Sequence, residues 1–443
     1  MKRILLLLPV VLVVGFLALA LVMRAKLIAY LESDACRVWL GEQVSEATGV
    51  RAEFTRLRPQ GLDAVYTDLL TLSTSGRQLM KAEQLRADIR IGWWSRECDI
   101  DLLEIMQVRL NLPPAGWPGK GEGASAAGSS TARLHQITVN DFGGLLGLHQ
   151  LKGMRLVVRP DLAGDWLFHG TGGTLRIAGR QEWSVDAVEG RQRGNQLFVT
   201  ASRLRIGERG EMTVSGEVSG GRSEWKGTFN QLPIETATSP ETGFIPADWR
   251  AELHGELAGD FSVVASGTGA PRYNVRVSLT NGELAALPLL DQVAKITRIE
   301  RFRRLPLHRA QATVQQDEDG VIRVSALNVE SRGLLRVEGA FTIRQGAIDG
   351  TVYVGVPQTV LQWVPGAQER VFTTQREGFY WTPVKLSGLA AHPNEDLSQR
   401  LLAAAAEESV RAVKESVRES AKGVIDAISP LVPVPVPKLP LLE

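Results

Sequence analysis

The side chains that could perform chemistry in this chain are few and far apart. Six histidines occur among 443 residues, without the spacing of a metal-binding motif: His135, His149, His169, His254, His308 and His392. A protein-bound zinc ion usually has three or four nitrogen, sulfur or oxygen ligands brought together by such a motif. We therefore interpret the histidines as ordinary polar residues, and the sequence predicts no metal site.

Motifs for nucleophilic or phosphate chemistry are also missing from the sequence. It contains no H-E-x-x-H, no G-x-S-x-G and no Walker A stretch. Asp99 and Asp101 alternate along one strand-like stretch with Arg96 nearby, and a carboxylate pair can serve as general acid and base. Such pairs more often mark a solvated face. We expect a protein that is not an enzyme and binds no cofactor.

Only two cysteines are present, Cys36 and Cys98, which is too few for a disulfide scaffold. A Cys36–Cys98 bridge can form if the chain is exported and the intervening elements bring the two residues together. The alternative is that both cysteines act as small buried hydrophobic residues. The sequence leaves both alternatives open.

Composition places the chain among globular proteins. Apolar residues make up 44% and charged residues 22%, with a formal net charge of +1. No basic block occurs, so we expect no nucleic-acid partner.

The N-terminus carries an uncharged run from Ile4 to Met23, preceded by Lys2 and Arg3. A helix of this length matches the hydrocarbon core of a bilayer, about 30 Å. Ala18-Leu19-Ala20 resembles the cleavage site of a signal peptide, but the run continues beyond it. The length of the run favours an uncleaved transmembrane anchor.

Most of the remaining chain alternates between apolar and polar residues, which is typical of strands with one apolar face. The stretch 334–356 predicts two strands joined by a turn at Gln345-Gly346, and 83–94 and 105–112 alternate in the same way. The apolar positions predicted to line the interior of the sheet are Leu85, Ile89, Ile91, Val108, Leu110, Leu335, Val337, Phe341, Ile343, Val352 and Val354.

Helical patterns are confined to a few stretches. One follows the anchor and ends at Gly49, a short one lies at 287–302, and an amphipathic one begins after His392-Pro393. The last is interpreted as a cap over an open edge of the sheet. These helices are too few to cover a one-sided sheet, so we expect a mainly β protein whose antiparallel sheet is either curved like a groove or paired in a sandwich. The periodicity is the same for both.

Two stretches resemble known sequence patterns. The first runs from EATGVRAEF through LTLSTSGRQLMKAEQLRADIRIGWW to IMQVRLNLPP. The second ends on Pro383, Val384, Leu386, Gly388 and Pro393. In order and position they resemble the opening and the C-terminal domain of the AsmA-like family of envelope proteins, over about half of the chain. The resemblance implies an inner-membrane anchor and a periplasmic body. Larger relatives fold a long twisted sheet into a groove implicated in moving phospholipid between membranes.

The sequence and the resemblance together predict six regions. They are an anchor (1–25), a helix with an AsmA-like β region (26–112), a flexible linker (113–133), a middle β region (134–282), an AsmA-like C-terminal β domain (283–393), and an amphipathic helix with a Pro-rich tail (394–443).

The expected function follows from this organisation. We expect a single-pass protein of the bacterial inner membrane, mostly periplasmic, that binds or passes phospholipid acyl chains along an apolar groove. It would serve envelope and outer-membrane lipid homeostasis, with phospholipid, the membrane and other envelope proteins as partners. The alternative is a structural or assembly factor for outer-membrane biogenesis, with a closed β core and no lipid cargo.

Overall fold

The computed structural model describes residues 26, 28–61, 63–74, 76–91, 98–112, 132–146, 149–176, 182–194, 196–234, 253–266, 269–285, 294, 300–362, 366–390 and 392–428. The predicted anchor, Ile4 to Met23, lies outside this part of the chain, as do residues 113–131 of the predicted linker and the Pro-rich tail. None of the helices within the described ranges is long and apolar enough to cross a membrane.

The protein is mainly β and divides into two compact units. Unit 1 comprises residues 1–232 and 260–269, and unit 2 comprises residues 233–259 and 270–443. The predicted region boundaries near residues 112, 133 and 282 fall inside these units.

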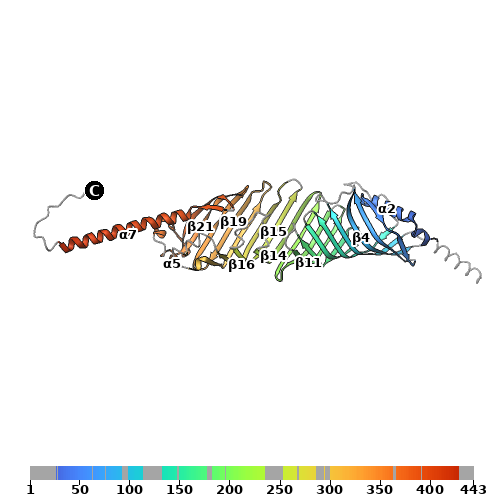
Figure 1. Cartoon of the computed structure of the whole chain (residues 1–443), viewed down its shortest axis with the longest axis horizontal. Coiled ribbons are helices and arrows are strands. Elements are labelled where there is room, and N and C mark those ends of the chain that lie inside the picture. Colours follow the sequence, from blue (N-terminus) through green and yellow to red (C-terminus); the bar gives the residue numbers. More distant parts are fainter. Residues whose placement is uncertain are drawn as a thin grey trace, which may run out of the picture. The chain divides into compact units, whose positions relative to one another are not determined.

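Unit 1 contains helix α2 (Asp34–Thr48), a short helical stretch before it over residues 28–31, and a series of strands (Figure 1). The strands are β1 (Arg51–Phe54), β2 (Leu57–Gln60), β3 (Ala64–Thr74), β4 (Arg77–Ile91), β5 (Cys98–Leu112), β6 (Ala132–Leu134), β7 (Ile137–Leu146), β8 (His149–Pro160), β9 (Trp166–Thr171), β10 (Thr174–Arg176), β11 (Glu182–Arg193), β12 (Gln196–Ile206), β13 (Gly210–Ser219) and β14 (Arg222–Pro233). The second half of β15 (Leu253–Ser266) also belongs to this unit.

Most neighbours in unit 1 pair antiparallel, as predicted, but one junction does not. Strand β5 runs parallel to both β6 and β7, with Cys98 opposite Ala132 and Leu103 opposite Ile137. A parallel neighbour requires the chain to cross back to the starting end of the first strand. Residues 113–131 make that return, so the predicted linker joins two parallel strands.

Unit 2 contains the remaining strands and the C-terminal helix. Its elements after β15 are β16 (Arg272–Ala285), the 3-10 helix η2 (Glu300–Arg303), β17 (Arg304–Leu307), β18 (Arg309–Gln316), β19 (Ile322–Ser331), β20 (Leu335–Arg344), β21 (Ala347–Pro357), α5 (Gln358–Leu361), α6 (Ala367–Arg370), β22 (Thr374–Arg376), β23 (Phe379–Leu389), β24 (His392–Glu395) and α7 (Leu397–Ile428). Of the helix predicted at 287–302, the structure describes Ala294, which is helical, and residues 300–302, which belong to η2. The other residues of that range lie outside the described part.

The hairpin predicted at 334–356 is confirmed. Strands β20 and β21 pair antiparallel, with Arg344 opposite Ala347 at the turn. Gln345 and Gly346 both have positive φ, 50° and 77°. Positive φ at both central residues is the geometry of a type I′ turn, whose twist matches that of the flanking strands.

Helix α2 protects the free edge of strand β1. Ser33, in an extended conformation, caps the helix by accepting a hydrogen bond from the Cys36 amide, and Gly49 ends it with φ 72°. The Ser45 hydroxyl accepts a hydrogen bond from the Ala52 amide at 2.8 Å, so a helix side chain pairs with the strand edge. The predicted end at Gly49 is confirmed, whereas Ser33 divides the predicted continuous helix.

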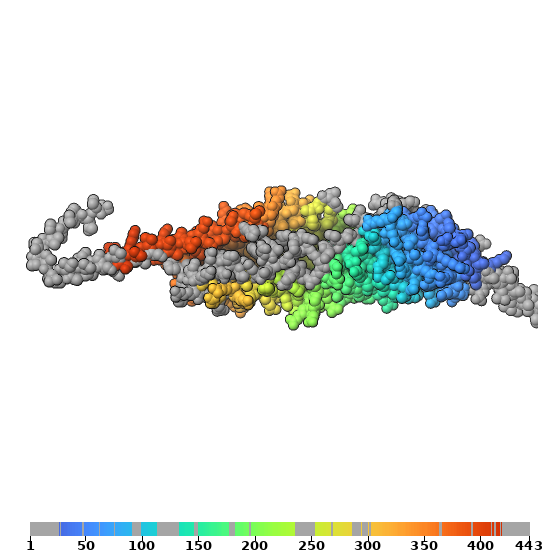
Figure 2. Space-filling model, in the orientation of Figure 1, coloured from blue at the N-terminus to red at the C-terminus, as the bar shows by residue number. Residues whose placement is uncertain are grey.

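A closed hydrophobic core lies beneath α2 and the first strands. It includes Leu70, Ala82 and Val108, which are opposite one another on β3, β4 and β5 and are 8%, 0% and 4% exposed. Val44 of α2 and Phe142 of β7 pack against the same core. Figure 2 shows the side chains of this region, in blue, closed together on the face in view. We call this cluster the N-terminal core.

Helix α7 caps the sheet edge with its first turns only. The Lys385 amide of β23 donates to Asp396 at 2.9 Å, and Arg400 donates to the Thr382 hydroxyl at 3.0 Å. Beyond Glu408 every described side chain of α7 is exposed, including Val410 and Val413. Figure 1 shows the red helix continuing past the strands of its unit. The predicted cap therefore holds for the start of the helix and not for its remainder.

Candidate functional site: an apolar sheet face

One side of strands β18, β19 and β20 in unit 2 consists of apolar residues in register. Val314, Val324 and Phe341 lie opposite one another, and residues directly opposite on neighbouring strands point to the same side. We call this side the apolar face. Its members on these strands are Ala310, Ala312, Val314, Ile322, Val324, Leu327, Val329, Leu335, Val337, Phe341 and Ile343, and Val354 extends it onto β21.

The apolar face is only half-buried. All of its members on β18, β19 and β20 are half-buried, and β20 contains no fully buried residue. On the adjoining strand β21, Ile348 and Val352 are buried, at 8% and 6% exposure. Among the described helices of unit 2, α5 packs on β21 and η2 on β17. The face therefore leaves part of its apolar area accessible.

Two aromatic residues of this sheet lie opposite glycines. Phe341 lies opposite Gly350, and a Cβ atom built on that glycine would be 2.5 Å from the Phe341 Cβ. Trp381 lies opposite Gly355, where an added Cβ would be 2.8 Å from the indole ring. Glycines at such positions let a neighbouring side chain lie down on the strand and favour local bending of the sheet.

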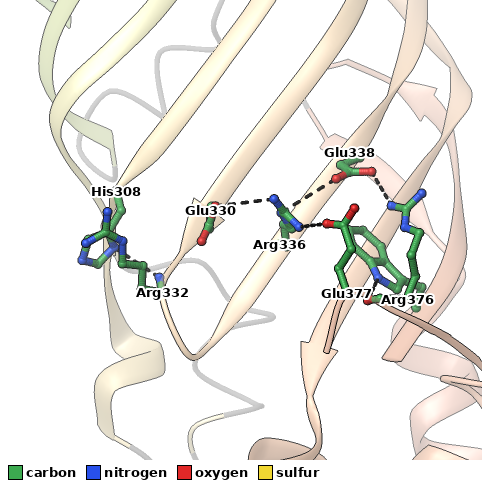
Figure 3. A network of polar contacts seen from close by, with 8 residues as sticks. His308, Glu330, Arg332, Arg336, Glu338, Arg376 and Glu377 are labelled. Atoms are coloured by element: carbon green, nitrogen blue, oxygen red, sulfur yellow. Dashed lines mark hydrogen bonds and ion pairs between the residues drawn. The ribbon is translucent and has the colours of Figure 1, made fainter. Parts of the chain in front are cut away.

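The other side of β20 is charged. Figure 3 shows Arg336 among three carboxylates, with Glu377 2.6 Å, Glu338 3.8 Å and Glu330 3.9 Å from its guanidinium nitrogens. The Arg336 side chain is only 17% exposed and stacks 5.8 Å from the Phe379 ring centroid. Strand β20 is thus ion-paired on one side and apolar on the other.

Arg376 extends this charged cluster to the β22–β23 hairpin. Its guanidinium bonds to Glu338 at 2.5 Å and lies 4.4 Å from the centroid of the Trp381 ring, whose indole N–H donates to the Arg376 carbonyl at 3.1 Å (Figure 3). Gly355 on the intervening strand β21 leaves room for the Trp381 ring. The cluster therefore fastens the hairpin to β20 across β21.

Three of the interior residues predicted near the anchor lie in or against the N-terminal core. Leu85 and Val108 are 5% and 4% exposed inside the N-terminal core, and Leu110 packs against it. Ile89 is half-buried, and the side chain of Ile91 lies outside the described part. Neighbouring strands and α2 enclose Leu85 and Val108, so these two interior residues belong to a closed core.

The interior residues predicted in the C-terminal half belong to one sheet face. Leu335, Val337, Phe341, Ile343 and Val354 are half-buried members of the apolar face. Val352 points to the same side but is buried, opposite Gly339 and Val384.

A second half-buried apolar stretch lies in unit 1 and was not predicted residue by residue. Met212 and Val214 of β13 lie opposite Phe229 and Gly227 of β14, and Phe229 stacks on Phe261 of β15 at 6.5 Å between ring centroids. These apolar side chains are half-buried. The alternation in EMTVSGEVSG was the signal that could have identified them.

The two cysteines considered as a possible disulfide do not form a common site in the described structure. Cys36 is a buried free thiol, and burial raises its pKa. The predicted Cys36–Cys98 bridge is not formed in this structure, and strand register places Cys98 opposite Ile91, at the far end of β4 from the N-terminal core.

Aspartates and histidines pair locally. Asp101 bonds to Arg90 at 2.6 Å, and Asp99 lies 3.8 Å from the His135 imidazole. The described residues contain no cluster of His, Cys, Asp or Glu that could hold a metal ion. Within this part of the chain, the apolar face is the feature that most needs a functional explanation.

Comparisons with known proteins return no match: no family model, no curated protein and no solved structure is similar to this chain. The resemblance to the AsmA-like family therefore stays a prediction.

Proposed function

We propose that this chain is an inner-membrane-anchored periplasmic protein that binds phospholipid acyl chains on the apolar face. Its role would be in envelope lipid homeostasis. The observation that supports this proposal is that eleven apolar residues on three neighbouring strands, β18, β19 and β20, are all half-buried. The uncharged run from Ile4 to Met23 supports the anchor.

The chemistry of the face suits a hydrocarbon chain better than a polar ligand. Its members offer methyl, methylene and phenyl groups, and the nearby charges of Arg336 and Glu338 belong to the opposite side of β20. Moving one methylene group from water onto an apolar surface contributes about 0.8 kcal/mol when burial is complete. An acyl chain in contact with several of these residues would therefore bind without a specific polar contact.

The alternative proposal is a structural or assembly factor without lipid cargo. The closed packing of the N-terminal core favours a structural role for the first strands of unit 1. The two proposals differ in whether phospholipid accompanies the purified protein.

One pair of adjacent variants tests the lipid proposal. Phe341→Asp places a carboxylate on the apolar face, whereas Ala340→Asp places the same group at an exposed position on the other side of β20. On a half-exposed face the new carboxylate can reach water, so we expect both variants to fold. Phospholipid per protein, measured by mass spectrometry after gentle purification, should fall severalfold in Phe341→Asp and stay unchanged in Ala340→Asp.

Two outcomes would contradict the proposal: wild-type protein that carries no phospholipid, or equal phospholipid content in all three proteins. Circular dichroism identifies any variant that unfolds, and Val337→Asn, a milder change on the same face, replaces Phe341→Asp in that case.

The proposed topology has its own test. A reporter enzyme fused after Glu443 should be active only if it requires export. Activity of a reporter that works only in the cytoplasm would rule the topology out.

A further inference from the structure

Helix α2 exposes apolar side chains on the surface that faces away from β1. Val38 is 52% exposed and Trp39 51% exposed, whereas Cys36 is 2% exposed. Tyr30, in the short helical stretch over residues 28–31 that precedes Ser33, is 52% exposed. A tryptophan with half of its surface in water is unusual, because the indole ring loses much apolar contact area there. This surface lacks a partner among the described residues.

The exposed apolar side chains are confined to one end of the helix. Ala35, Val38 and Trp39 lie in its first two turns, and the exposed positions that follow are Glu42, Gln43 and Glu46. The apolar end is the end nearer to the run from Ile4 to Met23. Carboxylates border this apolar end on both sides, with Glu32 and Asp34 exposed before it and Glu42 and Glu46 exposed after it.

The connection between the run and α2 is short and contains a change of direction. Residues 24–33 join them, and ten residues span at most about 35 Å when fully extended. Ser33 has φ −74° and ψ 150°, so a helix cannot pass through it unbroken. Helix α2 can therefore take a direction different from that of a spanning segment while staying near the membrane. Lys26, exposed in this connection, suits the headgroup region.

We propose that α2 lies along the membrane surface, with Val38 and Trp39 inserted among the lipid headgroups and β1 packed on its other side. The occupant of this surface is a phospholipid interface, where the indole ring contacts hydrocarbon while its N–H stays hydrated. The inference rests on the anchor in the proposed function. It adds that α2 fixes the orientation of the N-terminal core against the bilayer.

Fluorescence quenching in nanodiscs tests this inference on the full-length chain. The protein contains ten tryptophans, so Trp39 supplies about a tenth of the emission. Discs are prepared from plain phosphatidylcholine or from phosphatidylcholine brominated near the headgroup end of one acyl chain. The emission of wild type minus that of Trp39→Phe reports Trp39 alone. We expect bromination to reduce this difference at least twofold.

The matched control is Trp183→Phe, because Trp183 is 7% exposed and lies in unit 1. Its difference emission should be the same in both discs. A chain that does not co-elute with the discs contradicts the anchor and hence the proposed function. A chain that co-elutes while its Trp39 difference is unaffected by bromination contradicts the α2 inference alone.

A photo-reactive amino acid at position 39 in cells separates lipid from protein contacts. We expect adducts with phospholipid. A single discrete protein adduct without lipid adducts would overturn the inference in favour of a protein partner.

Discussion

The N-terminal core and the apolar face begin from the same sequence pattern and end in different states. In the N-terminal core, Leu70, Ala82 and Val108 form a cross-strand row that is at most 8% exposed. On the apolar face, Val324 and Phe341 form a comparable row in which both side chains are half-buried. The strands of both rows carry apolar residues on one side and mostly polar residues on the other.

The difference between the two regions lies in what covers them. Residues of α2, β1 and β7 pack into the N-terminal core, including Val44, Ala52 and Phe142. In unit 2, by contrast, α5 contacts β21, η2 contacts β17 and the start of α7 contacts the edge of β23. Period-two alternation therefore specifies which side of a strand is apolar, and elements elsewhere in the chain decide whether that side is closed.

The largest expected contrast comes from placing a charge in the N-terminal core. Leu85→Asp buries a carboxylate at a position that is 5% exposed, and an unpaired buried charge costs roughly 3–5 kcal/mol or more. We expect this variant to unfold or to lose most of its soluble yield. Phe341→Asp on the apolar face should remain folded. Urea denaturation followed by circular dichroism measures both.

Met106→Asp is the matched control for Leu85→Asp, since Met106 is 46% exposed on the neighbouring strand β5. It should cost less than about 1 kcal/mol. If Leu85→Asp and Phe341→Asp destabilise equally, the two regions are equally closed and the comparison fails.

A second contrast compares two leucine truncations. Leu79→Ala removes a side chain that is 1% exposed and should destabilise the protein by about 2–5 kcal/mol through lost burial and a residual cavity. Leu327→Ala removes a half-buried side chain of the apolar face and should cost roughly 1 kcal/mol after lipid is removed. Denaturation midpoints in the presence and absence of phospholipid measure both effects.

The effect of phospholipid on stability distinguishes the two leucine variants further. Added phospholipid should stabilise wild type more than Leu327→Ala and should leave the cost of Leu79→Ala unchanged. A lipid effect on Leu79→Ala as large as that on Leu327→Ala would count against the separation of the two regions.

The contact between α2 and β1 is the third point of comparison, because it is part of what closes the N-terminal core. A Cβ atom on Gly41 would lie 2.9 Å from the Ala52 carbonyl oxygen, so Gly41→Ala must shift the helix. Overpacking costs about 1–3 kcal/mol, against a gain of up to about 1 kcal/mol in helix propensity. We expect a net loss of about 1 kcal/mol in the free energy of unfolding.

Gln43→Ala, at an exposed position of the same helix, controls for propensity and should be neutral or slightly stabilising. Equal behaviour of the two alanine variants would mean that the helix does not need the close approach at Gly41.

Local chemistry made several elements predictable from sequence. The β20–β21 hairpin follows from alternation on both sides of Gln345-Gly346, two residues that adopt the positive φ of a type I′ turn. The end of α2 follows from Gly49 in the left-handed region. In each case the signal and the structure it specifies lie within a few residues of each other.

The closure of the N-terminal core could not be predicted, because it depends on contacts between distant segments. Leu85 and Phe341 have similar local sequences, and only the packing of α2, β1 and β7 distinguishes them. Alternation therefore placed Leu85 and Phe341 in the same predicted interior, although Leu85 is 5% exposed and Phe341 is half-buried. The parallel pairing of β5 with β7 has no local signal either, since the return segment 113–131 reads as a linker.

The smallest expected effect concerns the ion pair at this parallel junction. Arg109 of β5 and Asp141 of β7 form a two-pronged contact, with nitrogen–oxygen distances of 2.9 and 2.5 Å, and Gln107 adds a hydrogen bond to Asp141 at 2.7 Å. The Arg109 hydrogen bonds, helped by Gln107, hold the pKa of the Asp141 carboxyl below its usual value of 3.8, although partial burial opposes this.

Because the pKa of Asp141 is lower in the folded than in the unfolded protein, its contribution is present above the unfolded value. It is lost as the pH falls through the folded value. Both side chains are more than a third exposed, so water and salt screen the pair and its contribution is roughly 0.5–1 kcal/mol. Between about pH 5 and about pH 3, wild type should lose more free energy of unfolding than Asp141→Asn by that amount. Chemical denaturation at several pH values measures this slope, and parallel curves for the two proteins would show that the junction does not depend on the ionised pair.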